Sequence, residues 1–305
     1  MERRDFLKTA AVTGVVSVAA LSLPGAETAS KTAGSGKCDL VIVNGGTPAE
    51  MFDKGIAELG GMSAFVKKGQ KVAIKPNIGW AKTPEYAATT NPELIKRIVE
   101  SCFSAGASEV WVFDHTCNNW KDCYRLSGIS EAAKSAGAKV LPGHSKSEYK
   151  EVTLPQGKRL KTAQIHKNII DCDVFINVPV LKNHGGAILT GAMKNLMGIV
   201  WDRRYFHGND LQQCIADSVT YRKPDLNIVD AFNAMKAHGP RGKNLDDVLN
   251  LKTLLMSTDI VAVDTAACPL IGLSPEKIGH LKCGEELKLG TMNLDKLNVK
   301  RITLA

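Results

Sequence analysis

Residues 91–115, NPELIKRIVESCFSAGASEVWVFDH, hold a complete helix and the strand that follows it. Asn91 suits the N-cap, Pro92 the first helical position and Glu93 the first turn, where the helix dipole favours an acid. The helix is predicted to run as far as Gly106, because glycine commonly stops a helix. The last seven residues, EVWVFDH, are rich in β-formers and predict a strand.

The same alternation of strand and helix continues on both sides of this stretch. KVAIKPN at residues 71–77 predicts a strand before the helix. Beyond it, Ser130 is predicted to cap a helix that ends at Gly137, and KVLPG at residues 139–143 predicts a third strand. Such an order implies right-handed parallel crossovers. We therefore predict an α/β fold with a mixed, largely parallel sheet and helices on both faces, either as one body or as two lobes meeting near residues 145–185.

Further strand candidates follow along the chain. Residues 151–165, EVTLPQGKRLKTAQI, predict a hairpin, and residues 172–180, CDVFINVPV, predict a strongly apolar strand. A helix is expected across Thr265–Ile271, and no internal repeat of fixed period is visible. More strands are predicted in LNIVDA, TLLMSTDIVAVD and NVKRITLA, at residues 226–231, 253–264 and 298–305.

The N-terminus has the layout of a twin-arginine export signal. Arg3 and Arg4 precede a mildly apolar run over residues 9–23, and Pro24 and small residues follow it. The run is too short for a comfortable membrane span. We expect cleavage within residues 26–30, with an uncleaved membrane anchor as the alternative.

This signal implies a division of the chain and a compartment. We predict a signal peptide over residues 1–30, a polar linker over residues 31–37 and an α/β domain over residues 38–305. The twin-arginine export machinery is then a partner, and the location is periplasmic or otherwise extracytoplasmic. Because that machinery carries folded proteins, often with a cofactor already inserted, the signal also favours a bound cofactor.

The composition, with 44% apolar and 23% charged residues, is that of a globular protein with a large core. The formal net charge is +8, and the acids and bases of residues 1–30 cancel, so the basic balance belongs to the rest of the chain. The lysines are scattered and no arginine-rich stretch is present, which argues against nucleic acid as a partner. A small anionic molecule is the ligand that we expect, and a basic surface facing solvent is the alternative.

The cysteines give no clear metal motif. The chain has 8 of them, none in a C-x-x-C pair, and the closest spacing, Cys117 to Cys123, fits no common zinc or iron–sulfur pattern. Cys102 and Cys268 stand in apolar runs, where a small buried hydrophobe is the expected role. A disulfide between Cys117 and Cys123 is left open by the sequence.

Polar side chains follow three of the predicted strands. Lys75-Pro76-Asn77, Asp114-His115-Thr116 and Lys182-Asn183-His184-Gly185-Gly186 each stand at a strand end. In open α/β sheets, ligands bind beyond the carboxyl ends of parallel strands, so we expect the three groups to face one crevice. The alternatives are structural histidines at His115 and His184, and solvated surface lysines at Lys75 and Lys182.

The third group opens the run LKNHGGAILTGAMKNLMG at residues 181–198. Gly185 and Gly186 permit close approach of backbone to a ligand. A helix that begins near Ala187 would offer free N–H groups to an anion, with Lys194 two turns further in. The P-loop order of glycines and lysine is absent.

Two further sets of charged residues have open roles. Arg203 and Arg204, within WDRRYFH, either clamp an acidic group or belong to a polar loop with aromatic anchors. Asp230 and Asp264 follow predicted strands, where each could bind a cation or a hydroxyl group. Alternatively each caps a following helix, which is the favoured role for Asp264.

Several motifs together resemble one known family. IKPN after a strand, PVLKNH, LTGAMKNLMG, the later IVDA, and IVAVD followed by TAAC and PLIG resemble the domain of unknown function 362 family over most of residues 38–290. The resemblance is most specific in KNH and KNLMG. Members often carry a ferredoxin-like iron–sulfur segment, but its clustered cysteines are absent here.

The chain is more distantly similar to lactate racemase and its nickel-pincer relatives. In those proteins a histidine precedes, by ten residues, a lysine that holds the nickel-pincer nucleotide covalently, and His184 and Lys194 have that separation. His115 stands where those relatives place a histidine after a strand. The resemblance implies a metal near His184 and a nickel-pincer-type nucleotide, although KPNIGW after the first strand departs from the relatives' acid-and-arginine motif.

The leading hypothesis is an exported enzyme, or an enzyme-like binder, of an anionic nucleotide-type cofactor or a small acid. Racemase- or isomerase-like and oxidoreductase-like chemistry are both compatible with it. The alternatives are an iron–sulfur electron-transfer protein and a non-catalytic solute-binding protein. The expected catalytic residues are His115, His184 and Lys194; the expected cofactor-binding residues are Lys75, Asn77, Lys182, Gly185, Gly186 and Asn195; and His184 is the expected metal ligand.

Overall fold

The computed structural model describes residues 38–305, which belong to one compact unit rather than to two lobes. The predicted export signal and linker, residues 1–37, lie outside the described residues, so export stays a prediction. None of the helices within residues 38–305 has the length and the apolar run needed to cross a bilayer.

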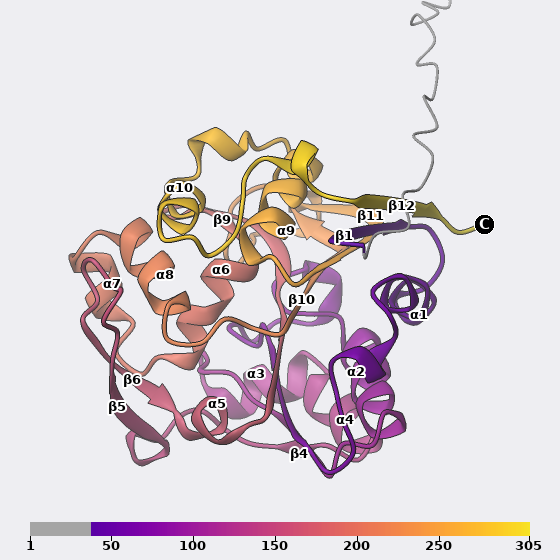
Figure 1. Cartoon of the computed structure of the whole chain (residues 1–305), viewed down its shortest axis with the longest axis horizontal. Helices are drawn as coiled ribbons and strands as arrows, with labels where there is room; N and C mark the ends of the chain where they lie inside the picture. Colours follow the sequence, from indigo (N-terminus) through magenta and orange to yellow (C-terminus); the bar gives the residue numbers. More distant parts are fainter. Residues whose placement is uncertain (1–37) are drawn as a thin grey trace, which may run out of the picture. The chain divides into compact units, whose positions relative to one another are not determined.

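A mixed sheet runs through the middle of this unit (Figure 1). Its parallel part has the order β4-β3-β2-β7-β10, and its other part continues as β11-β1-β12, with β11 antiparallel to both neighbours. The strands are β1 (Leu40–Asn44), β2 (Lys71–Pro76), β3 (Glu109–Val112), β4 (Lys139–Val140), β7 (Val174–Val178), β10 (Leu226–Met235), β11 (Val248–Ser257) and β12 (Val299–Thr303). The predicted mixed, largely parallel sheet is confirmed.

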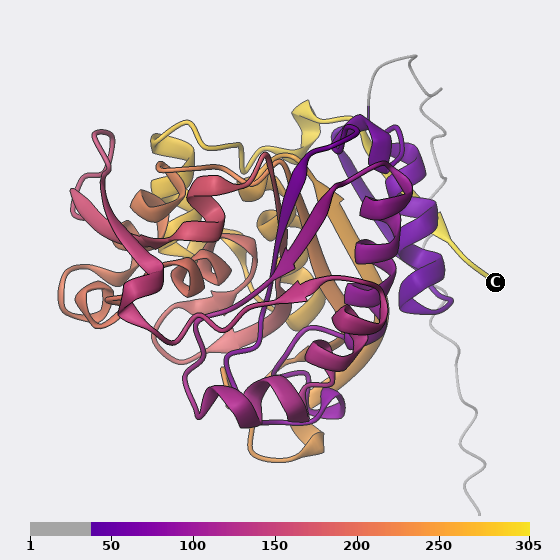
Figure 2. The same ribbon diagram turned by 90° about the horizontal axis from the view of Figure 1, so that it is seen from below.

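Alternation along the strands gives the sheet two apolar faces. On β2, Val72 and Ile74 pack into one hydrophobic cluster while Ala73 belongs to the other. Helices cover both faces, as predicted, and Figure 2 shows the sheet edge-on between them. On one face lie α1 (Pro48–Glu58), α2 (Pro92–Ser104) and α4 (Ile129–Ser135), and on the other lie α6 (Ala192–Asn195), α8 (Leu211–Val219), α9 (Ile260–Ala267) and α10 (Gly279–Glu286).

The local predictions around α2 agree with the structure. The Asn91 side chain accepts hydrogen bonds from the backbone N–H groups of Glu93 and Leu94, as an N-cap does. The predicted hairpin is also present, as β5 (Tyr149–Thr153) paired antiparallel with β6 (Thr162–His166).

Two predicted helix starts are wrong. Ser130 lies inside α4, whose N-cap is Gly128 at φ 70°, because this left-handed residue turns the chain directly from α3 (Trp120–Leu126) into α4. The helix expected from Thr265 begins instead at Ile260. Its cap is Asp259, which accepts from two backbone N–H groups, so the predicted strand ends at Ser257.

Candidate functional site

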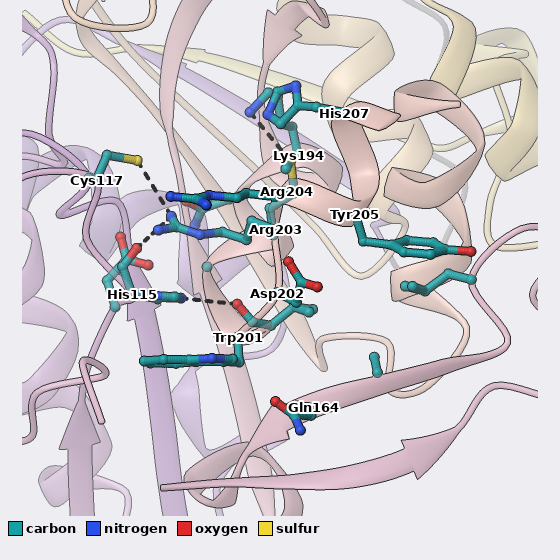
Figure 3. Close-up of a pocket in the computed structure, with 18 of the residues that line it drawn as sticks. His115, Cys117, Gln164, Lys194, Trp201, Asp202, Arg203, Arg204, Tyr205 and His207 are labelled. Carbon is teal, nitrogen blue, oxygen red and sulfur yellow. Dashed lines mark hydrogen bonds between the residues drawn. The ribbon is translucent and has the colours of Figure 1, made fainter. Parts of the chain in front are cut away.

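A cavity of about 1200 Å³ lies beyond the carboxyl ends of β2 and β3. Its walls also include side chains from the β5–β6 hairpin, from the hairpin of β8 (Val180–His184) with β9 (Ile188–Thr190), and from residues 194–207. Figure 3 shows His115, Arg203 and Lys194 around this cavity. The three segments expected to share one crevice therefore meet in the structure.

The structure places most of the residues singled out from the sequence in this wall. The cavity is lined by Lys75, Asn77, His115, Lys182, His184, Lys194 and Asn195, together with Arg203 and Arg204. Gly185 and Gly186 are not part of the lining. Asp230 and Asp264 are buried elsewhere and do not line it either.

Lys75 is held as a buried ammonium at the base of the site. Its Nζ lies 2.8 Å from Asp114 Oδ1 and donates to the carbonyl of Pro76 (2.7 Å) and to Asn195 Oδ1 (3.0 Å). Burial lowers the pKa of Lys75, and the Asp114 charge opposes that shift. Two hydrogen bonds and the ion pair with a carboxylate therefore surround this amine, which favours its protonated form.

Asp114 is the site residue whose role the sequence analysis missed. Its other oxygen, Oδ2, accepts from the backbone N–H of Ile78 (2.7 Å), so the carboxylate joins the ends of β2 and β3. The sequence did contain a signal for this ion pair. Lys75 and Asp114 have opposite charges, and each stands at the end of one of two consecutive predicted strands. Neighbouring parallel strands bring such ends together.

The backbone of Gly198 lies against the Lys75–Asp114 ion pair, and the pair fits because glycine has no side chain. A Cβ atom there would collide with Asp114 Oδ1 and with Cε and Nζ of Lys75. We expect Gly198→Ala to lower the free energy of unfolding by about 1 to 3 kcal/mol, as overpacking does. Chemical denaturation measures it.

Gly208 offers the matched control for that substitution, because an added Cβ meets nothing within 4 Å there. Gly208→Ala should change the free energy of unfolding by about 0.5 kcal/mol or less. Equal stabilities of the two variants would show that the packing around Asp114 relaxes easily and that Gly198 is not required.

Lys182 is equally buried but has no carboxylate partner among the described residues. Its Nζ donates to Asn77 Oδ1 (3.1 Å) and to the carbonyl of Ala88 (2.7 Å). Burial, with a further contribution from the charge of Lys194, lowers the pKa of Lys182 to about 7. The amine is therefore partly neutral near neutral pH.

Lys194, on α6, presents its amine to the cavity. Within residues 38–305 its one hydrogen bond runs from Nζ to Met197 Sδ, at 3.5 Å, and no carboxylate forms an ion pair with it. Burial lowers the pKa of Lys194 to about 8. Figure 3 shows the amine on the side of the cavity where His207 lies, and the charge of Lys194 lowers the pKa of His207 as well.

His115 combines a fixed ring with a free lone pair. Its Nδ1 is 3.1 Å from the carbonyl of Val200, so Nδ1 carries the proton and donates it, and Nε2 keeps a lone pair. The ring stacks on Trp201 with centroids 5.0 Å apart. Burial and the nearby Arg203 lower the pKa of His115. A neutral, oriented imidazole of this kind can accept a proton.

Arg203 adds a fixed positive charge beside His115 (Figure 3). It donates to the carbonyls of His115 and Thr116, both at 2.8 Å, and to Cys117 Sγ at 3.4 Å. No carboxylate within residues 38–305 pairs with it, so its charge is available to a ligand. The structure thus gives Arg203 more than the role of a solvated loop residue.

His184 has the opposite tautomer. Its Nδ1 accepts from the backbone N–H groups of Gly186 and Ala187, both at 3.0 Å, and burial lowers its pKa to about 3. The proton of the neutral ring is therefore on Nε2, which makes His184 a hydrogen-bond donor. A metal needs a lone pair, so these bonds argue against the expected metal-ligand role.

The helix expected to begin near Ala187 is also wrong. Gly185 and Gly186 form the turn between β8 and β9, and α6 begins only at Ala192. The reason is the His184 ring, which takes the N–H groups of residues 186 and 187 that were expected to face an anion.

The free backbone N–H groups at the N-terminus of α6 are bound by a carboxylate of the protein itself. Asp264 accepts from the backbone N–H groups of Ala192 (2.5 Å) and Met193 (2.9 Å), and Gly191 leaves room for the carboxylate. Burial raises the pKa of Asp264 to about 7. Asp264 thus caps α6, not the helix that follows it in the chain, and this correction removes it from the candidate cation ligands.

Within residues 38–305, no three His, Cys, Asp or Glu side chains gather as metal ligands, and all eight cysteines are free. The disulfide left open between Cys117 and Cys123 is not formed. For the implied nickel-pincer nucleotide, the cations of the cavity fit the phosphate groups, but His184 does not fit the metal.

Comparisons with known proteins extend this description. The chain matches the family described as "Domain of unknown function (DUF362)" over residues 72–269. It is 26% identical over 239 residues to a thylakoid-associated protein of Synechocystis sp., a match that covers 76% of this chain and 72% of that protein.

One solved structure, the lactate racemase apoprotein from Thermoanaerobacterium thermosaccharolyticum, is similar with a TM-score of 0.48 and 12% sequence identity. The match covers 77% of this chain but only 57% of that one.

Proposed function

Since the chain belongs to the DUF362 family, and the matched residues 72–269 carry the lysines and histidines of the cavity, we propose that it is an enzyme-like protein that binds a small organic anion there. His115 is the proton acceptor and Lys194 the principal cation of this proposal. Racemase- or isomerase-like chemistry is favoured over electron transfer, because an oriented neutral imidazole serves proton transfer.

The observation that carries the proposal is the excess of positive charge around the cavity. Among the described residues, only Lys75 of the lining cations forms an ion pair. Clefts lined by one sign of charge concentrate ligands of the opposite sign. The basic residues of the lining, besides the partly neutral Lys182, are Lys75, Lys146, Lys161, Lys194, Arg159, Arg203 and Arg204, against the carboxylates Asp114, Glu151 and Asp202.

The size of the cavity also supports a larger anion bound beside a small acid. Ligand pockets commonly measure about 300 to 1,000 Å³, and this cavity measures about 1200 Å³. A nucleotide-type cofactor is compatible with that volume and with the excess of cations. No step of the proposed chemistry passes through a metal, because His184 offers no lone pair.

The test is a ligand screen on the purified, folded chain. Lactate, pyruvate, oxalate and inorganic phosphate are added at increasing concentration while thermal unfolding is followed, since a ligand that binds only the folded state raises its melting temperature. Proton exchange at C2 of lactate in deuterated water then separates an enzyme from a non-catalytic solute-binding protein. If no anion shifts the melting temperature, the proposal fails.

Anion binding should weaken as pH rises from about 7 to about 10. The pKa of Lys194 is lowered to about 8, so this amine is charged below that value and loses its proton above it. Each pH unit above the pKa should lower the affinity by up to about tenfold, because binding then requires uptake of a proton. Isothermal titration calorimetry at several pH values measures how the affinity changes with pH. An affinity that stays constant would mean that the arginines alone bind the anion.

A further inference from the structure

Two fully buried lysines line the same cavity, yet their polar partners differ in charge. Lys75 has two neutral acceptors and, in addition, the carboxylate of Asp114 at 2.8 Å, which is the environment of an ammonium group. Lys182 has two acceptors, both neutral: Asn77 Oδ1 and the carbonyl of Ala88. A neutral amine has two N–H bonds and one lone pair, so these two acceptors use every hydrogen that it carries.

The orientation of the Asn77 amide follows from the same network. Asn195 Oδ1 accepts from the Lys75 ammonium, so that atom is the carbonyl oxygen of its amide. Asn77 Nδ2 donates to this oxygen at 3.0 Å, which leaves Asn77 Oδ1 to face Lys182. Lys182 therefore meets an acceptor that cannot become a donor without breaking the bond to Asn195.

Burial is the main factor that favours the neutral form of Lys182, and within residues 38–305 no carboxylate lies within 4.0 Å of its Nζ. The charge of Lys194 lowers the pKa further, and smaller effects of Cys117 and Asp114 oppose this shift. Desolvation and a neighbouring cation are the two conditions that turn a lysine into a nucleophile at neutral pH.

We propose that Lys182 forms a Schiff base with the carbonyl group of an α-keto acid, whose carboxylate is held by the cations of the cavity. The proposal rests on the proposed anion binding and names a substrate class for the same site. Lys194, whose amine has no carboxylate partner among the described residues, is available to the carboxylate of that substrate.

The step balances without an oxidant or a reductant. The Lys182 nitrogen attacks the carbonyl carbon, a C–N bond forms, and the carbonyl oxygen takes a proton to give a carbinolamine. The hydroxyl group then leaves as water after a second proton transfer, and a C=N bond remains. His115, with a lone pair on Nε2, lines the same cavity and can take each of the two amine protons from the nitrogen and pass it to the oxygen, so that both leave in the water molecule. His184, with a proton on Nε2, can donate a hydrogen bond to that oxygen.

The experiment traps this bond in the full-length folded chain. Pyruvate or glyoxylate is added, sodium borohydride reduces any imine to a secondary amine, and intact-mass and peptide mass spectrometry locate the adduct. We expect one adduct per chain, with the mass of the keto acid less water plus two hydrogens, on Lys182. Adduct formation should require no denaturant and should be lost when the chain is unfolded before the addition. An adduct confined to Lys194, Lys75 or surface lysines would overturn the proposal.

Lys182→Met is the matched variant, because methionine has a similar length, carries no charge, like the neutral amine that it replaces, and cannot form an imine. It should lose the trapped adduct. Melting temperatures establish that the variant is folded. If the parent chain binds pyruvate without any trapped adduct, the Schiff base is excluded and anion binding stands; if neither lactate nor pyruvate binds, the proposed function itself fails.

Discussion

Asp114→Asn is expected to lower the free energy of unfolding by about 3 to 5 kcal/mol, the loss that follows removal of one partner of a buried ion pair. The side chains of Lys75 and Asp114 are 1% and 3% exposed, and their charged atoms are 2.8 Å apart. Asparagine keeps the shape and can still accept from the backbone N–H of Ile78. The variant therefore removes only the negative charge, and the Lys75 ammonium is left buried without its carboxylate partner. Urea denaturation followed by circular dichroism measures the change.

Two controls identify the cause of that loss. The double variant Lys75→Met/Asp114→Asn removes both charges and should recover much of the stability, because an apolar pair of similar volume often replaces a buried ion pair without cost. Glu286→Gln breaks the exposed pair of Lys158 with Glu286, 2.7 Å apart, and should leave stability within experimental error. A double variant no more stable than Asp114→Asn would refute the electrostatic explanation.

Lys194→Met is expected to weaken binding of the best anion found in the screen by about 10- to 100-fold, with little change in melting temperature in the absence of ligand. A charge-assisted hydrogen bond contributes about 1.5 to 3 kcal/mol, which corresponds to that range. Lys194 makes no ion pair within the described residues, so its loss leaves no buried charge unpaired. Isothermal titration calorimetry at about pH 7 measures the affinity.

Lys134 on α4 provides the control for long-range electrostatics. It is exposed and lies on the face of the sheet opposite α6, so Lys134→Met removes the same charge from the chain but none from the cavity. Its effect on affinity should be less than about twofold at physiological ionic strength, because charges further apart than a Debye length are screened. Equal losses in both variants would mean that Lys194 does not contact the anion.

The local features of the fold were predictable because their signals are local. The cap at Asn91, Pro92 at the first helical position and the apolar strands on either side fix α2 and its neighbours within a few residues of sequence. The errors came where a contact distant in sequence decides a local structure. Asp264 caps α6 across 72 residues, and the His184 ring closes the β8–β9 turn in place of a helix.

The sequence alone placed lysines, asparagines and histidines at the ends of strands, and the parallel order of those strands required that the ends meet. It could not assign the state of any of them, because protonation and tautomer depend on burial and on partners brought together only by folding. Lys75 and Lys182 look alike in the sequence. The tertiary structure alone gives one of them Asp114, 39 positions away, as an ion-pair partner. It leaves the other with two neutral oxygens, and burial then lowers the pKa of Lys182 to about 7.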